Sequence, residues 1–216
     1  MMGIIRPVRR SGLDAVPRSG QEAVSGHTQR KARSRARILE EAAGMIREHG
    51  HAGIGVAALM KQAGLTHGGF YAHFPSRDDL VAHAVDRMFA DSAALVSNRL
   101  DTDDPRDGLR RLIDDYLSDE ARRAVNKGCP LPSLTGDVPR MPPGARQRFA
   151  VGIDAFRTAL EQAFTAIAAP EPASLASSVL SEMVGAMALA RALDDDDKAS
   201  AMLEASKTQI KARIGL

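Results

Sequence analysis

The sequence has few of the residues that crosslink or stiffen small folds. Its 216 residues include one cysteine, Cys129, two tyrosines and no tryptophan. A single cysteine excludes an intramolecular disulfide, and no Cys/His spacing is typical of a structural zinc site, so we expect neither a metal nor a cofactor. Cysteine usage of this kind favours a reducing compartment, and we predict a cytoplasmic protein.

Long apolar runs are also missing. No run approaches the roughly 18 residues that a transmembrane helix needs, and the N-terminus lacks an apolar core followed by a small-residue cleavage site. We therefore expect no membrane partner. Runs of β-branched residues are scarce, whereas Ala, Leu, Arg and Met are plentiful, which predicts an all-α protein.

Charge is spread unevenly along the chain. Residues 1–37 contain nine basic and two acidic residues, a net charge of +7, which leaves −5 for the rest of a chain whose net charge is +2. Residues 1–27 mix Gly, Ser, Pro and Arg without a period, so we predict a disordered basic leader there. It is either a solvated tail or an arm that contacts nucleic acid, because phosphate contacts depend on local positive charge.

The apolar spacing after this leader predicts about nine helices and no strand. Helical periodicity begins near Gln29, and the first helix closes at His49-Gly50. Short helices are then expected over residues 56–62 and 67–74. A capping box at residues 76–79 opens a long fourth helix.

The C-terminal part keeps the helical spacing apart from one irregular stretch. Asp104-Pro105 is typical of a helix start, and the proline- and glycine-rich residues 126–144 hold at most one short helix near Leu134. Residues 194–197 are expected to form an acidic loop in which Asp197 caps the last helix. One helix is expected to bury the stripe Phe149, Ile153, Phe156, Leu160, Phe164 and Ile167.

Residues 56–74 have the layout of a helix-turn-helix, in which a glycine-containing turn joins two short helices. Leu59, Leu65 and Phe70 can form a small core that holds the helices at a steep angle. The hydroxyl of Thr66 suits the N-cap of the second helix, and the following glycines allow close approach to DNA. The residues expected at phosphates and base edges are Thr66, His67, Gly68, Gly69, Tyr71, His73 and Arg77.

Residues 64–80 read Gly-Leu-Thr-His-Gly-Gly-Phe-Tyr-Ala-His-Phe-Pro-Ser-Arg-Asp-Asp-Leu and resemble the signature of the TetR/AcrR family of transcriptional regulators. In that family a glycine-led turn precedes a short recognition helix with a Phe-Tyr and a His-Phe pair. The body from Asp91 onward is similar only in helix count and order. Residues 128–132, Gly-Cys-Pro-Leu-Pro, are similar to a segment of one branch of these regulators.

The resemblance implies a two-part, all-helical protomer. Residues 28–75 would form a three-helix DNA-binding domain, and residues 76–216 a helical ligand-binding and dimerisation domain. It further implies a homodimer, a pseudo-palindromic double-stranded DNA operator and a small-molecule effector that releases a repressor from DNA.

The resemblance also assigns roles to single residues by motif position. Tyr71 and Arg77 would contact backbone phosphates, and His73 would touch the backbone or support the turn. The resemblance places Thr66, His67 and Gly68 nearest to the bases. We therefore expect Tyr71→Phe and Arg77→Ala each to weaken operator binding.

Two positions depart from the family pattern. Gly55 stands where the second helix usually begins with Thr or Ser, so the usual cap and phosphate contact are either missing there or made by the backbone alone. Met60 stands where Ala is usual, which widens the packing between the two short helices. The basic residues on the preceding helix, between Arg30 and Arg37, form either an ordinary helix face or one or two phosphate contacts.

The body offers weaker signals. Cys129 is either a small buried hydrophobe or a thiol that senses oxidation or electrophiles beside a pocket. His67 and His73 lack metal-ligand spacing. Small residues in the last two helices, such as Gly185 and Ala188, suit a dimer interface or packing within the protomer. The residues that could line a ligand cavity, or equally form plain core, are Met88, Phe89, Tyr116, Cys129, Phe149, Phe156 and Met183.

Together these features predict a ligand-responsive, sequence-specific transcriptional regulator that acts as a repressor. One alternative keeps the DNA-binding unit but makes the protein an activator, or a regulator switched through Cys129. The other is a helical enzyme, which the lack of an activated nucleophile, metal spacing or phosphate-binding glycine loop disfavours. Steep salt dependence of DNA binding distinguishes a regulator from an enzyme.

Overall fold

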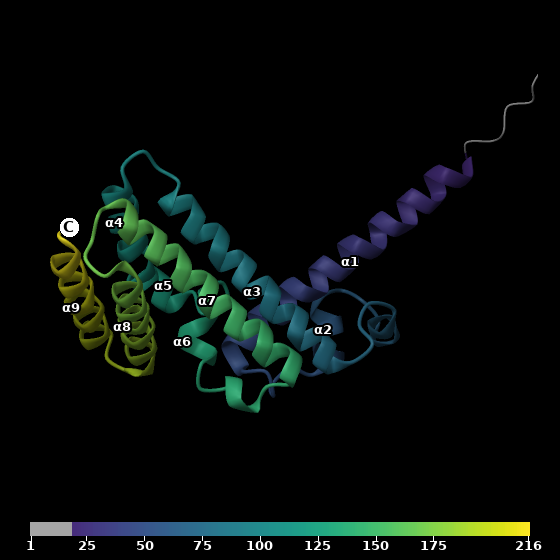
Figure 1. The fold of residues 1–216 in the computed structure, drawn as a ribbon. Helices are drawn as coiled ribbons and strands as arrows, with labels where there is room; N and C mark the ends of the chain where they lie inside the picture. The colour runs from purple at the N-terminus through teal and green to yellow at the C-terminus, as the bar shows by residue number, and fades with distance from the viewer. Residues whose placement is uncertain (1–18) are drawn as a thin grey trace, which may run out of the picture. The chain divides into compact units, whose positions relative to one another are not determined.

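The structure, a computed structural model, describes the backbone of residues 19–216 and the side chains of residues 28–216. This part of the chain forms nine α-helices and two short 3-10 helices and contains no strand (Figure 1). The all-α prediction is therefore confirmed. Residues 1–34 and residues 35–216 form two units, each of which is described by itself.

The first unit contains the N-terminal part of helix α1 (Ser19–His49). The helix begins ten residues before the predicted position near Gln29, because helix formers such as Gln and Glu extend it toward the N-terminus. The basic side chains of Arg30, Lys31 and Arg33 are exposed. The predicted disordered leader covers residues 1–27, and its first 18 residues lie outside the part of the chain that the structure describes. Its last nine residues are helical, which differs from the prediction.

The second unit opens with a small cluster of short elements. Helix α1 ends at His49 and Gly50 follows with φ +72°, as the sequence predicts. Helix α2 (Val56–Gln62) has the predicted bounds. The next segment, η1 (His67–Ala72), is a 3-10 helix that ends two residues before the predicted helix end. Two glycines in six residues disfavour a longer helix, which explains the difference.

The body is built around two long helices. Helix α3 (Arg77–Leu100) and helix α7 (Pro143–Ala166) lie side by side (Figure 1), and helix α4 (Pro105–Tyr116) packs against both. The predicted caps are confirmed, because Ser76 Oγ accepts from the Asp79 N–H at 3.1 Å and the Asp104 carboxylate accepts from the Arg106 N–H at 2.9 Å. Ser76 and Asp104 therefore set the starts of α3 and α4.

The segment between α4 and α7 is more ordered than predicted. It contains helix α5 (Asp119–Arg123), helix α6 (Pro130–Leu134) and the 3-10 turn η2 (Val138–Arg140), whereas the sequence predicts at most one short helix near Leu134. Ser118 caps α5 by accepting from the Ala121 N–H at 3.1 Å. Elements of three to five residues carry too little periodicity to be recognised.

Helix α8 (Pro172–Ala192) and helix α9 (Asp196–Ile214) pack together at one end of the body (Figure 1). By length and composition α8 could cross a membrane, a property that the sequence analysis did not assign to any stretch, but a core helix passes the same test. The last helix is capped by Asp195, which accepts from the Lys198 N–H at 3.0 Å, and not by Asp197. In α7, Ile153 is exposed, so the predicted stripe is buried only in part.

Candidate DNA-contacting surface and effector cavity

The turn and η1 present the predicted DNA-binding residues to solvent. Thr66, His67 and Gly68 are exposed, and Tyr71 is 69% exposed. Thr66 occupies the N-cap position of η1, but its side chain makes no capping hydrogen bond, so the predicted cap is wrong. The hydroxyl is thereby left for another partner.

Buried aromatic rings hold this surface in place. Phe70 and Phe74 are almost fully buried, with ring centroids 5.8 Å apart. The ring of Tyr71 meets Phe70 edge-on, with centroids 5.2 Å apart. His73 is half-buried beside Phe74, a position that suits support of the turn. Phe70 and Phe74 thus face the core, and the Tyr71 ring points outward from this buried pair.

The two departures from the family pattern have clear local effects. Gly55 is the N-cap of α2 and makes no side-chain capping bond. Met60 is fully buried, and its terminal methyl lies 3.7 Å from the place where a Cβ on Gly69 would be. Met60 thus fills the space under η1, which replaces the contact that a larger residue at position 69 would make.

Arg77 has partners other than the predicted phosphate. Its Nε donates to the Ile54 carbonyl at 3.2 Å, and a terminal nitrogen donates to the His51 carbonyl. Both carbonyls belong to the loop between α1 and α2. Two of its donors are thus engaged within the protein, because the loop leaves carbonyl groups that the guanidinium can satisfy. The geometry gives Arg77 a positioning role.

Basic residues of α1 also make contacts inside the second unit. The guanidinium of Arg35 stacks over the Phe74 ring, 4.8 Å from its centroid. That of Arg37 lies beside Gly64, whose φ of +65° is one that residues other than glycine rarely adopt. Both side chains therefore hold the turn region in place, in addition to the positive charge that they supply.

The loop after α1 is tied to the body by an ionic contact. Asp137, between α6 and η2, accepts from the His51 N–H at 3.0 Å, and its carboxylate lies 2.6 Å from His51 Nδ1. Burial opposes ionisation of Asp137, but these hydrogen bonds outweigh it and hold the pKa of Asp137 below its usual value. Through His51 the same contact reaches Arg77.

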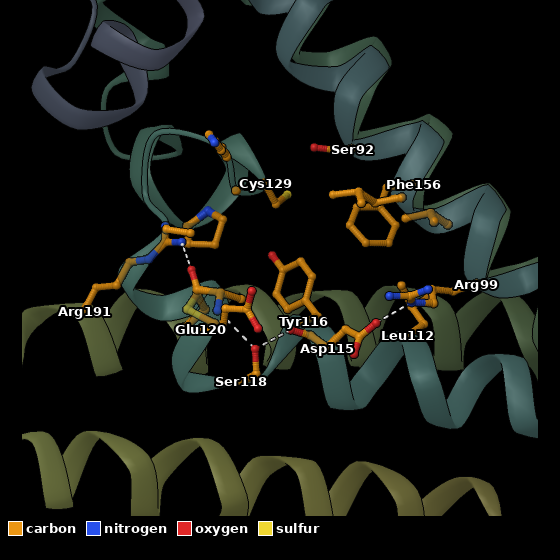
Figure 2. Close-up of a pocket in the computed structure, with 18 residues that line it drawn as sticks. Ser92, Arg99, Leu112, Asp115, Tyr116, Ser118, Glu120, Cys129, Phe156 and Arg191 are labelled. Carbon is orange, nitrogen blue, oxygen red and sulfur yellow. Dashed lines mark hydrogen bonds and ion pairs between the residues drawn. The ribbon is translucent and has the colours of Figure 1, made fainter.

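A cavity of about 380 Å³ lies within the body, between helices α3 to α8 (Figure 2). Three of the seven predicted pocket residues line it: Tyr116, Cys129 and Phe156. The wall also contains apolar groups such as Leu112 and Met187. At the rim, Arg99 pairs with Asp115. The cavity is of the size that binds a small organic molecule.

The other four predicted pocket residues do not line this cavity. Met88, Phe149 and Met183 are fully buried core residues. Phe89 borders a separate space of about 100 Å³ and packs on Gly152, where a Cβ would lie 2.3 Å from the ring. Helical spacing could not separate core from cavity wall, because both are apolar and face inward.

Two polar groups meet inside the cavity. The hydroxyl of Tyr116 is directed toward the Cys129 thiol (Figure 2). Burial raises the pKa of the Cys129 thiol, and hydrogen bonds with the Leu131 N–H and the hydroxyls of Tyr116 and Ser92 offset this only in part, as does the charge of Arg47. Burial also raises the pKa of Tyr116 well above its ordinary value. Both groups are therefore protonated at neutral pH.

Two arginines near the cavity, buried Arg47 and half-buried Arg191, escaped the sequence analysis. Arg191 of α8 donates to the carbonyls of Arg122 and Ala121, at 3.2 and 2.9 Å, and to Ser133 Oγ at 2.8 Å. Arg47 of α1 donates to the Asn126 carbonyl at 3.1 Å. Burial lowers the pKa of each guanidinium below its ordinary value. Their partners are far away in sequence, so no local pattern marks them.

Arg47 also reaches the long helix that follows η1. Its terminal nitrogen lies 3.2 Å from the Met88 carbonyl and 3.4 Å from the Asp91 carboxylate. Asn126 precedes Lys127, Gly128 and Cys129, which line the cavity. One side chain thus joins α1, α3 and the cavity wall.

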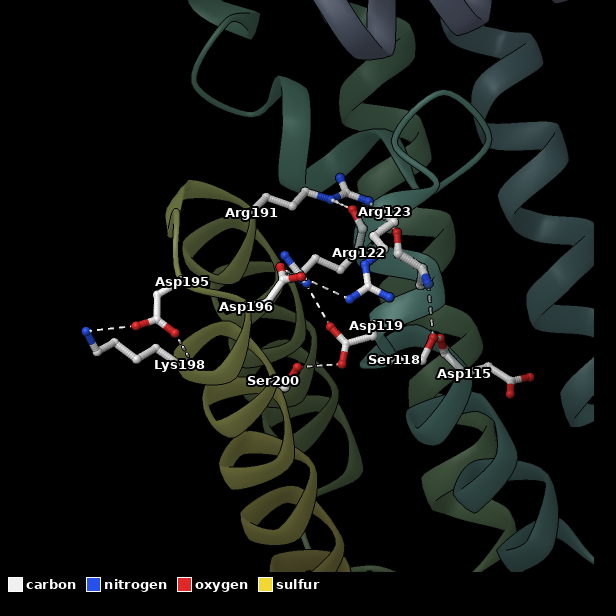
Figure 3. A network of polar contacts seen from close by, with 11 residues as sticks. Asp115, Ser118, Asp119, Arg122, Arg123, Arg191, Asp195, Asp196, Lys198 and Ser200 are labelled. Carbon is white, nitrogen blue, oxygen red and sulfur yellow. Dashed lines mark hydrogen bonds and ion pairs between the residues drawn. The ribbon is translucent and has the colours of Figure 1, made fainter.

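The α5 wall is anchored on its other side to α9 (Figure 3). Arg122 donates to the carboxylates of Asp119 and Asp196, at 2.8 and 2.6 Å, and Ser200 Oγ donates to Asp119 at 2.5 Å. These hydrogen bonds lower the pKa values of Asp119 and Asp196. The network holds α5 on the start of α9, while the loop beyond α5 is held by Arg47. Among residues 28–216, no group of three or more His, Cys, Asp or Glu side chains could hold a metal ion.

Comparison with known proteins gives two family matches. Residues 38–84 match the model of bacterial regulatory proteins of the tetR family, and residues 105–206 match that of a tetracyclin repressor-like C-terminal domain. These matches coincide with the helix-turn-helix and with the helices that enclose the cavity. No curated protein matches the chain.

Solved structures of similar fold cover most of the chain. A TetR transcriptional regulator from Chloroflexus aurantiacus has 26% identity and a TM-score of 0.75, over 87% of this chain and 96% of its own. The reduced form of Escherichia coli NemR has 20% identity and a TM-score of 0.74, over 83% and 95%. A TetR-family regulator from Agrobacterium tumefaciens has 20% identity and a TM-score of 0.72, over 83% and 98%. At 20% identity, the last two show a common fold alone.

Proposed function

Because the chain belongs to the tetR family of bacterial regulatory proteins, we propose that it is a homodimeric repressor released from its operator by a small molecule. It is a helix-turn-helix DNA-binding transcription regulator. The single observation that carries the repressor proposal is the pairing of an exposed η1 surface with a cavity in the helical body of the same chain. We assign it no catalytic role and a cytoplasmic location.

On DNA, η1 would enter the major groove. Thr66, His67 and Gly68 would lie nearest to the bases, Gly69 would allow close approach, and the exposed Tyr71 would donate to a phosphate. Two-fold symmetry would space the two recognition segments about 35 Å apart or a multiple of that, so the operator would be pseudo-palindromic. Arg77 is proposed here to position the loop before α2.

Selection from a random DNA library tests the DNA-binding part. The purified full chain is incubated with the library at two salt concentrations, and Tyr71→Phe is treated in parallel. We expect one enriched pseudo-palindrome, bound more weakly by the variant and more weakly at higher salt. Binding without any enriched sequence, or no binding at either salt concentration, would contradict a sequence-specific repressor.

The effector would act through the contacts that tie the cavity to α1 and α3. A molecule that displaces the loop at Asn126 alters the acceptor of Arg47, and with it the contacts of α1 with Met88 and Asp91. A change in the tilt of α3 would alter the spacing of the two recognition segments. A difference in effector affinity of about 1–3 kcal/mol between the two arrangements is sufficient.

The dimer would use α8 and α9. Leu189 of α8 is 59% exposed, and a Cβ on Gly185 would meet nothing within 4 Å, so this face is apolar and open. We expect Leu189→Glu to give a monomer in sedimentation analysis. Val151→Glu is the matched control, because Val151 is 66% exposed on α7. If Leu189→Glu remains a dimer, as Val151→Glu is expected to, the proposed interface is wrong.

A thiol switch at Cys129 is the second candidate for regulation. Its position in the cavity wall, next to the loop that Arg47 holds, favours it. The raised pKa of the thiol weighs against it, because the thiolate is the reactive form. If Cys129→Ser keeps the full response to oxidants or electrophiles, the switch is excluded.

A further inference from the structure

The hydroxyl group of Tyr116 lacks a good partner. Its oxygen is buried, and within residues 28–216 the one group that it meets is the Cys129 thiol, with which it makes no hydrogen bond of normal geometry. The ring is fixed by edge-on contact with Phe156, with centroids 6.1 Å apart. A buried hydroxyl that has only a thiol to bind is poorly satisfied, so the free protein holds this donor at a cost that a ligand with a stronger acceptor can relieve.

The neighbours of the hydroxyl leave it available to a ligand. Figure 2 shows it directed across the cavity toward Cys129, and a thiol is only a weak acceptor. Ser92, on the α3 side, uses its own hydroxyl proton on the Met88 carbonyl at 3.1 Å. The surrounding wall is apolar, with Val96, Leu112 and Phe156. A molecule in the cavity therefore meets the phenol donor beside an apolar wall, while the cationic donors Arg99, Lys127 and Arg191 also line the cavity.

The charges nearby favour an acceptor. The positive charge of Arg191 acts on Tyr116, and that of Arg47 acts on Cys129. Two acids are among the lining residues: Asp115 is paired with Arg99, and Glu120 is exposed to solvent. The high pKa of Tyr116 keeps the phenol protonated, so it donates and does not carry charge. An electron-rich oxygen on the ligand is the complement to this environment.

We propose that Tyr116 selects effectors that carry a carbonyl oxygen on an aromatic or similarly apolar body, with the phenol donating to that oxygen. This deepens the proposed function, since it rests on the cavity being the effector site. A volume of about 380 Å³ accommodates a body of a few fused rings. The oxygen is placed between Tyr116 and Cys129, close to the loop that Arg47 holds.

Two probes of nearly identical shape test the selection. In 2-acetylnaphthalene the side group is a ketone, and in 2-isopropenylnaphthalene a methylene group replaces the oxygen. Calorimetric titration of the full chain, without DNA, is expected to show the ketone binding about tenfold more tightly. Tyr116→Phe should remove that preference and leave the affinity for the hydrocarbon unchanged. Tyr71→Phe, at the other tyrosine of the chain, should keep it.

Two readouts separate this role from a structural one. The carbonyl stretching frequency of the bound ketone should be lower in the unmodified protein than in Tyr116→Phe, because a hydrogen bond weakens the C=O bond. Without a ligand, Tyr116→Phe should unfold at the same temperature or higher, since it removes an unsatisfied group. A clear fall in unfolding temperature would show that the hydroxyl already has a partner and would overturn the proposal.

The binding results alone are also sufficient to test the selection by Tyr116. Equal affinity for the two probes, an unchanged preference in Tyr116→Phe, or no binding of either probe would each overturn the selection by Tyr116. The failure of the proposed function looks different, because it is the absence of an enriched operator. If the chain selects an operator but does not distinguish the probes, only the proposed role of Tyr116 is refuted. If it distinguishes the probes but selects no operator, only the repressor function is refuted.

Discussion

The two tyrosines of this chain are found in opposite environments. Tyr71 on η1 is 69% exposed on a buried aromatic base, whereas Tyr116 on α4 keeps its hydroxyl inside a cavity. The DNA-contacting surface is made by consecutive residues of one short segment. The cavity is made by six helices whose residues are far apart in sequence. A surface function can thus be encoded locally, while an interior function depends on the packing of the whole body.

The largest expected effect comes from truncating one buried aromatic ring in each region and comparing the losses of operator binding and of ketone binding. Phe70 and Phe149 are both almost fully buried, and truncation of such a ring costs about 3–5 kcal/mol. We expect Phe70→Ala to abolish operator binding while 2-acetylnaphthalene still binds. Phe149→Ala should impair both activities. The test is to measure the operator affinity of both variants and, by calorimetric titration, their affinity for the ketone. Loss of ketone binding in Phe70→Ala would show that the two regions are not separable.

The sequence predicted the first region well and the second only in outline. The bounds of α2, the glycine after α1 and the exposure of Tyr71 follow from local rules of capping and alternation. Arg77 shows the limit, because its carbonyl partners lie in a loop with no periodic signal.

In the body, Tyr116, Cys129 and Phe156 were predicted among seven candidates. Nothing in helical spacing tells a cavity wall from a packed core, as Met88 and Phe149 illustrate. The two arginines near the cavity are defined by partners more than 50 residues away, such as Asn126 for Arg47 and Ser133 for Arg191.

Arg77 offers the next largest effect. Arg77→Gln removes two hydrogen bonds from a charged donor, and we expect operator affinity to fall by about 2 kcal/mol because the loop before α2 is released. The slope of log affinity against log salt should stay the same. A phosphate contact would instead reduce the slope by about 0.9. Filter-binding titrations over a salt series distinguish these outcomes.

Asp137 gives a smaller effect that depends on pH. Its pKa is lower in the folded protein than its ordinary value of 3.8, so its contribution to stability is present above that value and is lost as the pH falls through the folded pKa. We expect Asp137→Asn to lower the free energy of unfolding by about 1.5–2 kcal/mol at neutral pH. Urea unfolding of both proteins should show the difference shrinking below about pH 4. A difference that persists there would contradict the ionic origin.

The smallest expected effect concerns coupling between the regions. Lysine cannot reproduce the separate contacts of Arg47 with Asn126 and Met88. Arg47→Lys should therefore retain operator affinity but respond less to 2-acetylnaphthalene. Arg87→Lys is the matched control, because Arg87 pairs with Asp91 at 2.7 Å and, among the contacts of residues 28–216, makes none to the cavity loop. An equal loss in both variants would assign the coupling to Asp91.

The most direct test of a ligand-responsive repressor is a linkage measurement. The affinity of the full chain for its selected operator is measured with and without saturating 2-acetylnaphthalene, and the affinity for the ketone is measured with and without operator. We predict that each ligand weakens the other by the same factor, between about 5 and 150. Unchanged operator affinity in the presence of a ketone that demonstrably binds the cavity would contradict the account.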